Sequence, residues 1–129
     1  MKQLNIEAGR SYPNIHFDAE KHYLSITGES YPEDTASFFE PVFDWLNEYF
    51  EHFQNENLVL DVELLYFNSS SSKALADIFD LLESKAKNHQ SITVNWRYHE
   101  ENDMSLEYGE EFQEDYSIIK FNLVEFSDN

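Results

Sequence analysis

Four consecutive serines, residues 69–72, stand between an asparagine and a lysine in the stretch YFNSSSSKAL. An alternating, strand-like segment precedes them and a helix-like segment follows, so the run marks a junction between a strand and a helix. Hydroxyl groups at such a junction could act as a nucleophile, hold a bound phosphate, accept a phosphoryl group or cap the helix. Each of these roles requires particular neighbours, which the sequence either supplies or lacks.

The neighbours of the run do not favour nucleotide binding or serine-nucleophile catalysis. A phosphate-binding loop needs glycines, so that backbone amides can approach the phosphates, and a lysine followed by serine or threonine. The run contains no glycine, and Ala74 follows Lys73. Ser70 and Lys73 match the S-x-x-K element of penicillin-recognising enzymes, and SDN occurs at residues 127–129, but the chain has no K-T-G element. We interpret this match as coincidence.

The histidines and carboxylates do not indicate a catalytic site or a metal site either. The five histidines are scattered and form no spaced motif, and HEEND at residues 99–103 is the only candidate for a metal cluster. Residues 100–115 carry eight carboxylates and neither lysine nor arginine, which is typical of a solvated helix and loop. We therefore expect no metal, no cofactor and no catalytic residue. A small enzyme that uses this acidic segment is kept as an alternative hypothesis.

Two roles for the serine run remain open, helix capping and phosphorylation. As an N-cap, a serine hydroxyl accepts a hydrogen bond from an amide in the first helical turn and contributes about 1 kcal/mol. As a phosphorylation site, a serine at a helix start would place its phosphate near free amides and the positive end of the helix dipole. The added charge of about −1.5 to −2 would change what the adjacent surface can bind. Both roles can hold together, on different serines.

The composition indicates one folded domain, residues 1–129, whose acidity favours solubility first and a protein partner with a basic patch second. Hydrophobic residues make up 41% of the chain, which is enough for a core, and cysteine is absent. There are 26 Asp and Glu residues against 8 Lys and Arg, and the formal net charge of −18 repels nucleic acid and anionic membranes. No apolar run is long enough to span a membrane or to serve as a signal peptide, so we expect a soluble, cytoplasmic protein.

Hydrophobic periodicity predicts the order in which strands and helices follow one another. The predicted strands are residues 14–18, 22–27, 58–67, 91–100 and 117–126, and the predicted helices are residues 33–53, 70–87 and 103–115. Pro41 predicts a kink, or a short turn before the main helix, because an interior proline costs about 3 kcal/mol. Helices between the later strands imply that those strands pair in parallel.

Alternation along the strands predicts how the layers stack. In residues 58–67, Asp61 and Glu63 lie on one face of the strand. The side chains that share the opposite, apolar face are Leu58, Leu60, Val62, Leu64 and Tyr66. A sheet covered on both faces would instead have strands that are apolar almost throughout. We therefore predict an α/β, two-layer domain with a mixed sheet, helices mainly on one face and the other face largely solvent-exposed.

Several segments of the chain resemble the SiaC family of bacterial regulatory phosphoproteins. The segments that carry the resemblance are SYPED, FDWLNEYF, LLYFNSSSSKAL, VNWRYHEENDM and GEEFQED. The resemblance extends from near residue 4 to near residue 125. The family fold is similar to STAS domains, the anti-sigma-factor-antagonist class. That fold agrees with the order of strands and helices, which was inferred independently from periodicity.

The resemblance implies a phosphorylation switch. In this family the acceptor is the hydroxyl residue directly after the motif asparagine, which is Ser69 after Asn68 here, whereas the best-known member has threonine. A serine/threonine kinase of the histidine-kinase-like ATPase superfamily would add the phosphate, and a metal-dependent PPM-type phosphatase would remove it. The unphosphorylated form would bind and activate a diguanylate cyclase, raising cyclic-di-GMP and promoting biofilm formation. The neighbours expected to contact the partner are Asn68, Ser70, Ser71 and Lys73.

A related hypothesis keeps the switch and changes its target. An anti-sigma-factor antagonist in a partner-switching circuit would use the same phosphoserine geometry against a different protein. Gene neighbourhood separates the two, because a kinase, a PPM phosphatase and a cyclase encoded nearby favour the cyclase target. A sigma factor encoded nearby favours the alternative. In either case we expect no enzymatic activity of the chain itself.

Overall fold

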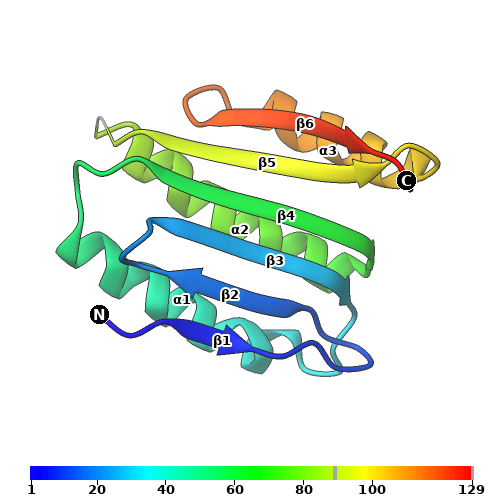
Figure 1. The fold of residues 1–129 in the computed structure, drawn as a ribbon, viewed down its shortest axis with the longest axis horizontal. Helices are drawn as coiled ribbons and strands as arrows, with labels where there is room; N and C mark the ends of the chain where they lie inside the picture. The colour runs from blue at the N-terminus through cyan, green and yellow to red at the C-terminus, as the bar shows by residue number, and fades with distance from the viewer. Residues whose placement is uncertain (89, 129) are drawn as a thin grey trace.

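A computed structural model describes residues 1–88 and 90–128 as a sheet backed by helices (Figure 1). The strands are β1 (Leu4–Ile6), β2 (Asn14–Asp18), β3 (Tyr23–Ser30), β4 (Leu58–Phe67), β5 (Ile92–His99) and β6 (Lys120–Phe126). The helices are α1 (Thr35–His52), α2 (Ser69–Ala86) and α3 (Asp103–Asp115). The strands lie in the sheet in the order in which they occur in the chain.

The sheet is mixed, as the periodicity predicts. β1, β2 and β3 pair antiparallel, whereas β3, β4, β5 and β6 pair in parallel. Each parallel connection contains one helix, and the helices lie behind the sheet in the view of Figure 1. The predicted two-layer arrangement is therefore confirmed. The carboxyl ends of β3 to β6 meet at one edge of the sheet, on the right in Figure 1.

The core lies between the helix layer and the inward face of the sheet. Alternate side chains of the central strands point into it, and Leu60, Val62 and Val94 are fully buried. The stripe that α1 buries against them is wide and includes Phe39, Val42, Trp45, Leu46, Tyr49 and Phe50. Burial of such apolar faces, more than intrinsic helix propensity, holds the helices on the sheet.

The first helix, α1, continues through Pro41. Asp34 starts α1 as its N-cap, because its carboxylate accepts a hydrogen bond from the Ser37 amide at 3.1 Å. The helix then runs through Pro41 to His52, so the predicted alternative of a separate short turn before the main helix is wrong. Pro41 and Ser37 are both exposed. Water can therefore serve the Ser37 carbonyl that the proline leaves without its helical partner.

The sequence prediction also misplaces strands at the two edges of the sheet. It misses β1, which has three residues and pairs with β2. It starts the last strand at Ser117, whereas β6 starts at Lys120. The reason is a contact with α2. The Glu83 carboxylate accepts hydrogen bonds from the backbone amides of residues 117–119, with N···O distances of 2.9–3.1 Å. Those amides are therefore not available to a strand ladder.

β4 departs from strict alternation near its carboxyl end. Gly28 of β3 is the partner of Leu64, and the next residue, Glu29, is the partner of Tyr66. Leu65 is therefore an extra residue, a β-bulge, and both Leu65 and Tyr66 are exposed. The prediction that Tyr66 shares the apolar face of Leu64 is wrong, because the bulge shifts the alternation by one residue.

A row of polar side chains crosses the open face of the sheet. The Asp61 carboxylate on β4 accepts hydrogen bonds from the Tyr23 hydroxyl at 2.6 Å and from Asn95 Nδ2 at 2.8 Å. Asn122 Nδ2 continues the row by donating to Asn95 Oδ1 at 2.9 Å. The row joins β3, β4, β5 and β6, and its side chains are half-buried. This face of the sheet is therefore polar, and no helix of the described residues covers it.

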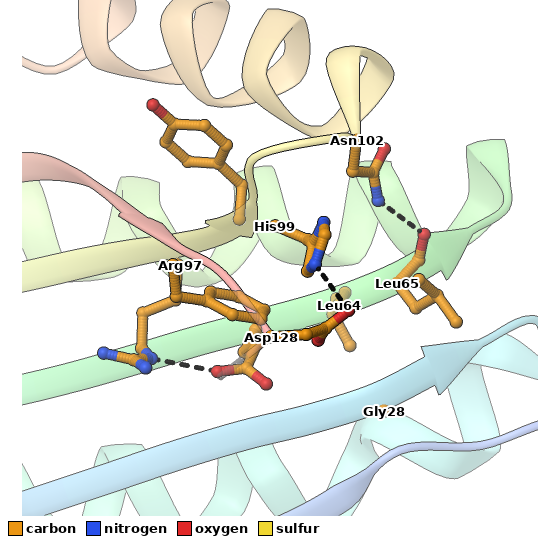
Figure 2. Close-up of a pocket in the computed structure, with 10 residues that line it drawn as sticks. Gly28, Leu64, Leu65, Arg97, His99, Asn102 and Asp128 are labelled. Carbon is orange, nitrogen blue, oxygen red and sulfur yellow. Dashed lines mark hydrogen bonds and ion pairs between the residues drawn. The ribbon is translucent and has the colours of Figure 1, made fainter.

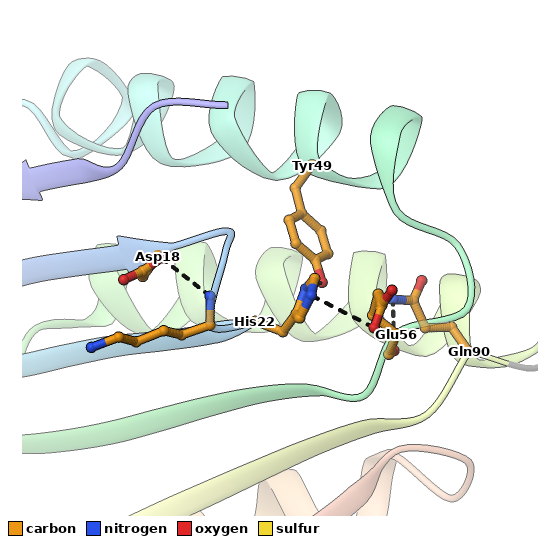
Figure 3. A network of polar contacts seen from close by, with 6 residues as sticks. Asp18, His22, Tyr49, Glu56 and Gln90 are labelled. Atoms are coloured by element: carbon orange, nitrogen blue, oxygen red, sulfur yellow. Dashed lines mark hydrogen bonds and ion pairs between the residues drawn. The ribbon is translucent and has the colours of Figure 1, made fainter.

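Tyr49 joins α1 to the segments just before the amino-terminal ends of β3, β4 and β5 (Figure 3). Its hydroxyl lies 2.8 Å from His22 Nδ1, and Glu56 Oε2 lies 3.6 Å from His22 Nε2. Gln90 Nε2 donates to the Glu56 carbonyl at 3.1 Å and closes the network. Burial, and secondarily the charge of Glu56, raises the pKa of Tyr49 to about 12.

The raised pKa of Tyr49 predicts a loss of stability at alkaline pH. In the folded state Tyr49 keeps its proton to about pH 12, whereas an unperturbed tyrosine ionises near pH 10.0. Between these values the unfolded state binds fewer protons, so the free energy of unfolding falls as pH rises. Urea unfolding across this range should show a shallower fall for Tyr49→Phe than for the wild type. Equal slopes in the two proteins would contradict the assignment.

Candidate functional site at the start of α2

Asn68 starts α2 and fixes the position of the serine run. Its side-chain Oδ1 accepts a hydrogen bond from the Ser71 amide at 2.9 Å, so Asn68 is the N-cap. The Asn68 amide donates to the carbonyl of Ser30, at the end of β3, at 3.0 Å. The interpretation that one of the serines caps the helix is therefore wrong, because the residue before the run already occupies the cap position.

Ser71 lies inside the protein. It is fully buried, and its hydroxyl oxygen is 2.8 Å from the hydroxyl oxygen of Ser30. It falls on the buried stripe of α2, one turn before Leu75. The prediction that Ser71 contacts a partner disagrees with this burial, because a partner could reach its hydroxyl only by opening the start of the helix.

Ser69 and Ser70 are exposed at the first two positions of α2. Within residues 1–88 and 90–128, their backbone amides donate to no protein acceptor, as is usual in the first turn of a helix. Such amides, together with the positive end of the helix dipole, favour an anion at this point. The geometry thus offers accessible hydroxyls at a position where a phosphate is tolerated.

Lys73 supplies a cation on the same surface. Its side chain is 79% exposed, and its ammonium lies 3.3 Å from the Asp77 carboxylate. Lys73 follows Ser69 by four residues, and side chains with this spacing are neighbours on a helix. A phosphate on Ser69 would therefore compete with Asp77 for the Lys73 ammonium.

An apolar groove opens between α1 and α2, beside Ser70 and Lys73. The volume of this groove is about 530 Å³. A trough on the open face of the sheet, described below, has a similar volume of about 460 Å³. The side chains that form its apolar walls are Ala36, Phe39, Phe43 and Ala74. Phe39 is buried, whereas Phe43 is half-buried and Ala36 is exposed, so part of the apolar wall is open to solvent.

A second apolar surface lies at the carboxyl end of β4 and the start of α3. The bulge leaves Leu65 66% and Tyr66 51% exposed, and Met104 in the first turn of α3 is 63% exposed. Tyr31, just after β3, packs on Tyr66 with 5.8 Å between ring centroids. Asn102 Nδ2 donates to the Leu65 carbonyl at 3.1 Å and holds the start of α3 beside the bulge. We call Tyr31, Leu65, Tyr66 and Met104 the strand-end patch.

Sequence reasoning does not predict the strand-end patch. The available signal is the segment LLYF at residues 64–67, which is apolar throughout although the preceding residues alternate. Such a run, which only Asn68 separates from the serines, has more apolar side chains than one buried face of a strand can take. It could have indicated that some of them face outward next to Ser69.

Figure 2 shows a trough on the open face of the sheet, next to the bulge. Its volume is about 460 Å³, and Gly28 and Leu65 are among the residues that line it. Arg97 Nε pairs with Glu63 Oε1 at 2.9 Å, and the Arg97 guanidinium stands 5.5 Å from the centre of the Phe126 ring. The main cation of the trough is therefore already neutralised within the protein.

The HEEND segment forms contacts within the protein at the end of this trough. His99 Nδ1 accepts a hydrogen bond from the Glu101 amide at 3.0 Å, and His99 Nε2 lies 3.1 Å from the Asp128 carboxylate. Among the described residues, no three His, Asp or Glu side chains are placed to hold a metal ion. Asn129, the last residue of SDN, lies outside the described residues. Within residues 1–88 and 90–128, no helix is long and apolar enough to cross a membrane.

Comparisons with known proteins agree on one family. A family model described as SiaC family regulatory phosphoprotein matches residues 6–126. An uncharacterised protein of Pseudomonas aeruginosa strain UCBPP-PA14 is 39% identical over 118 residues, which are 92% of this chain and 93% of that protein. The solved structure of SiaC of Pseudomonas aeruginosa is similar with a TM-score of 0.87 and 36% identity, over 99% of this chain and 100% of that one. The structure of the diguanylate cyclase SiaD in complex with its activator SiaC, from the same species, matches with a TM-score of 0.87 and 37% identity, over 97% and 99%.

Proposed function

The chain belongs to the SiaC family of regulatory phosphoproteins, and on that basis we propose that it is a phosphorylation-controlled switch and not an enzyme. In its unphosphorylated form it binds and activates a diguanylate cyclase in the cytoplasm, which raises cyclic-di-GMP and promotes biofilm formation. A kinase of the histidine-kinase-like ATPase superfamily phosphorylates Ser69 and switches the protein off. A PPM-type phosphatase restores it.

The exposure of Ser69 at the first position of α2 carries this proposal. A kinase can reach this hydroxyl, whereas the Ser71 hydroxyl is fully buried. A phosphate on Ser69 meets helix amides that have no protein acceptor and the positive end of the dipole. Phosphorylation can therefore change the charge of the surface while α2 stays folded.

The choice of target rests on the similarity to a protein with a known partner. SiaC is described as the activator of the diguanylate cyclase SiaD, and that SiaC chain is similar to this one over almost the whole length of both. This supports a cyclase, rather than a sigma-factor system, as the target. Asn68, Ser70 and Lys73 remain the residues of the serine region proposed to contact the cyclase, and Ser71 has a structural role instead.

We expect the phosphate on Ser69 alone. After incubation with the cognate kinase and ATP, the intact mass of the wild type should increase by one phosphate, and peptide mapping should place it on Ser69. Ser69→Ala should stay unmodified because the hydroxyl is gone. The matched control is Ser70→Ala, which removes the other exposed hydroxyl and should be phosphorylated like the wild type. Full phosphorylation of Ser69→Ala would refute the acceptor assignment.

A further inference from the structure

The trough on the open face of the sheet contains a buried donor that no acceptor of the described residues satisfies. His99 Nδ1 accepts a hydrogen bond from the Glu101 amide at 3.0 Å, so in the neutral ring Nε2 carries the proton. Nε2 is fully buried, and its N–H is aligned with no acceptor in residues 1–88 and 90–128. A buried donor in this state is unfavourable, because it has lost its water without gaining an acceptor. It is therefore available to an acceptor that a ligand brings into the trough.

Asp128 places a carboxylate beside this donor without holding it firmly. One of its carboxylate oxygens lies 3.1 Å from His99 Nε2, which is an ion-pair distance but not an aligned hydrogen bond. The Asp128 side chain is 91% exposed and follows β6, which ends at Phe126. It can therefore turn into water without unpacking the core. The trough thus accommodates a carboxylate next to His99, and the carboxylate that is there can be displaced.

Arg97 adds donors on the same face of the sheet. Its Nε donates to the Glu63 carboxylate at 2.9 Å, which occupies one side of the guanidinium. The planar guanidinium has five N–H donors, so it can bind a second acceptor while it keeps Glu63. Arg97 and His99 are two residues apart on β5 and therefore face the same side of the sheet (Figure 2). Donors of both side chains can thus reach one ligand.

The walls and the size of the trough suit a small, flat molecule. The centre of the Phe126 ring is 5.5 Å from the Arg97 guanidinium and 5.4 Å from the centre of the His99 ring. Leu64 and Leu65 add apolar surface, and the volume is about 460 Å³. Sites for small organic molecules have volumes of about 300–1,000 Å³ and combine apolar walls with a few polar groups. The trough meets this description.

The acidity of the protein does not prevent an anion from binding at this position. Exposed charges more than about 8 Å away are largely screened at physiological salt. Among the residues that line the trough, the charged ones are Glu63, Arg97 and Asp128, and the first two neutralise each other. A carboxylate from a ligand would take the place of the Asp128 carboxylate instead of adding to it. The exchange therefore leaves the charge beside His99 unchanged.

We propose that the trough is a binding site for a small organic carboxylate with a flat, apolar body. The ligand carboxylate accepts hydrogen bonds from His99 Nε2 and from the Arg97 guanidinium, and the body lies against Phe126. Asp128 is an internal competitor, which stands at the carboxylate position when no ligand is bound. This site requires neither the cyclase nor phosphorylation of Ser69, so it goes beyond the proposed function and is tested separately from it.

Benzoate and benzamide test the recognition of a carboxylate, because they share a ring and nearly the same size and only benzoate is charged. In titrations of the full chain followed by nuclear magnetic resonance, benzoate should shift the signals of the Arg97 Nε–H and the His99 amide with a Kd of about 1 mM. Benzamide should bind at least about tenfold more weakly. Equal affinities for the two compounds would overturn the proposal, as would the absence of these shifts at about ten times that benzoate concentration.

Two variants test the residues. Asp128→Asn removes the competing charge and should bind benzoate about fivefold more tightly than the wild type. Its matched control is Asp44→Asn, the same change at an exposed position on α1, which should bind like the wild type. His99→Phe keeps a ring against Phe126 but removes the Nε2 donor, so it should bind at least about tenfold more weakly. Urea unfolding checks that each variant is folded. No gain in Asp128→Asn over its control, or wild-type affinity in folded His99→Phe, would overturn the site.

Discussion

Ser69→Asp is expected to weaken cyclase binding about a hundredfold. The aspartate carboxylate would have to lose its water inside the proposed interface, and a cost of about 3 kcal/mol corresponds to that factor. Folding should not suffer, because residue 69 is in the first turn of α2, where a negative charge adds about 0.3–1 kcal/mol of stability. Titration calorimetry with the cyclase, and urea unfolding of the same sample, would measure the two effects separately.

Ser69→Asn is the control for this experiment, because an amide has nearly the size of the carboxylate and no charge. It should lose much less affinity than Ser69→Asp. If the two variants lose the same affinity, the effect is one of size and the charge switch is wrong. If Ser69→Asp binds as tightly as the wild type, a negative charge at this position does not control the complex.

Trp96→Ala is expected to lower the free energy of unfolding by about 3–5 kcal/mol, the range for a large buried aromatic residue. Trp96 is 1% exposed, and its ring centroid lies 5.8 Å from that of Phe67 and 5.4 Å from that of Phe112. α3 lies so close that a Cβ on Gly109 would stand 2.5 Å from Trp96 Cδ1. Removing the indole therefore leaves a cavity under α3 and also removes the hydrogen bond to Ser105. Urea unfolding with the tyrosine signal would measure the loss.

Trp96→Phe separates packing from the hydrogen bond. It keeps an aromatic ring against the same neighbours and loses the Nε1 donor to Ser105, so it should cost less than Trp96→Ala. A loss of under about 1 kcal/mol in Trp96→Ala would mean that the core repacks around the site, against the usual behaviour of close-packed interiors. The same stability measured for both variants would show that the ring contacts contribute nothing beyond the hydrogen bond.

Hydrophobic periodicity predicts the central strands and helices well, because each buried face is long enough to repeat its pattern. β5 is an example, with Ile92, Val94 and Trp96 buried and the residues between them half-buried. β1 has three residues, Leu4–Ile6, which is too short to show an alternation. It forms because β2 offers it an antiparallel edge. Pairing of this kind depends on the partner strand and cannot be read from the segment itself.

The bulge in β4 could not be predicted for a related reason. Its evidence is the shift in pairing between β3 and β4 after Gly28, which is a property of two strands together. Within residues 58–67, strict alternation placed Tyr66 inside, and only the pairing shows that Leu65 is the additional residue. The exposure of Leu65 and Tyr66 follows from this bulge, so these two apolar residues of the strand-end patch were hard to predict.

The serine run was partly predictable. The sequence predicts that the run lies between a strand and a helix that starts at residue 70. In the structure, α2 starts at Ser69. The burial of Ser71 had a signal that was available, since it precedes Leu75 by four residues and so falls on the same helix face. The choice of Asn68 over the serines as the cap had no such signal, because all these residue types are good N-caps. The backbone at the end of β4 decides it.

The buried pair of hydroxyls on Ser30 and Ser71 has a consequence for how a kinase would recognise Ser69. Together with the Asn68 cap, this pair fastens the first turn of α2 to the end of β3. If Ser69 is the acceptor, it cannot be drawn out as an extended peptide, and its kinase has to recognise the folded surface around it. Kinases that bind short, extended linear motifs would then not phosphorylate Ser69. The fold itself would then protect this circuit from unrelated kinases in the same cell.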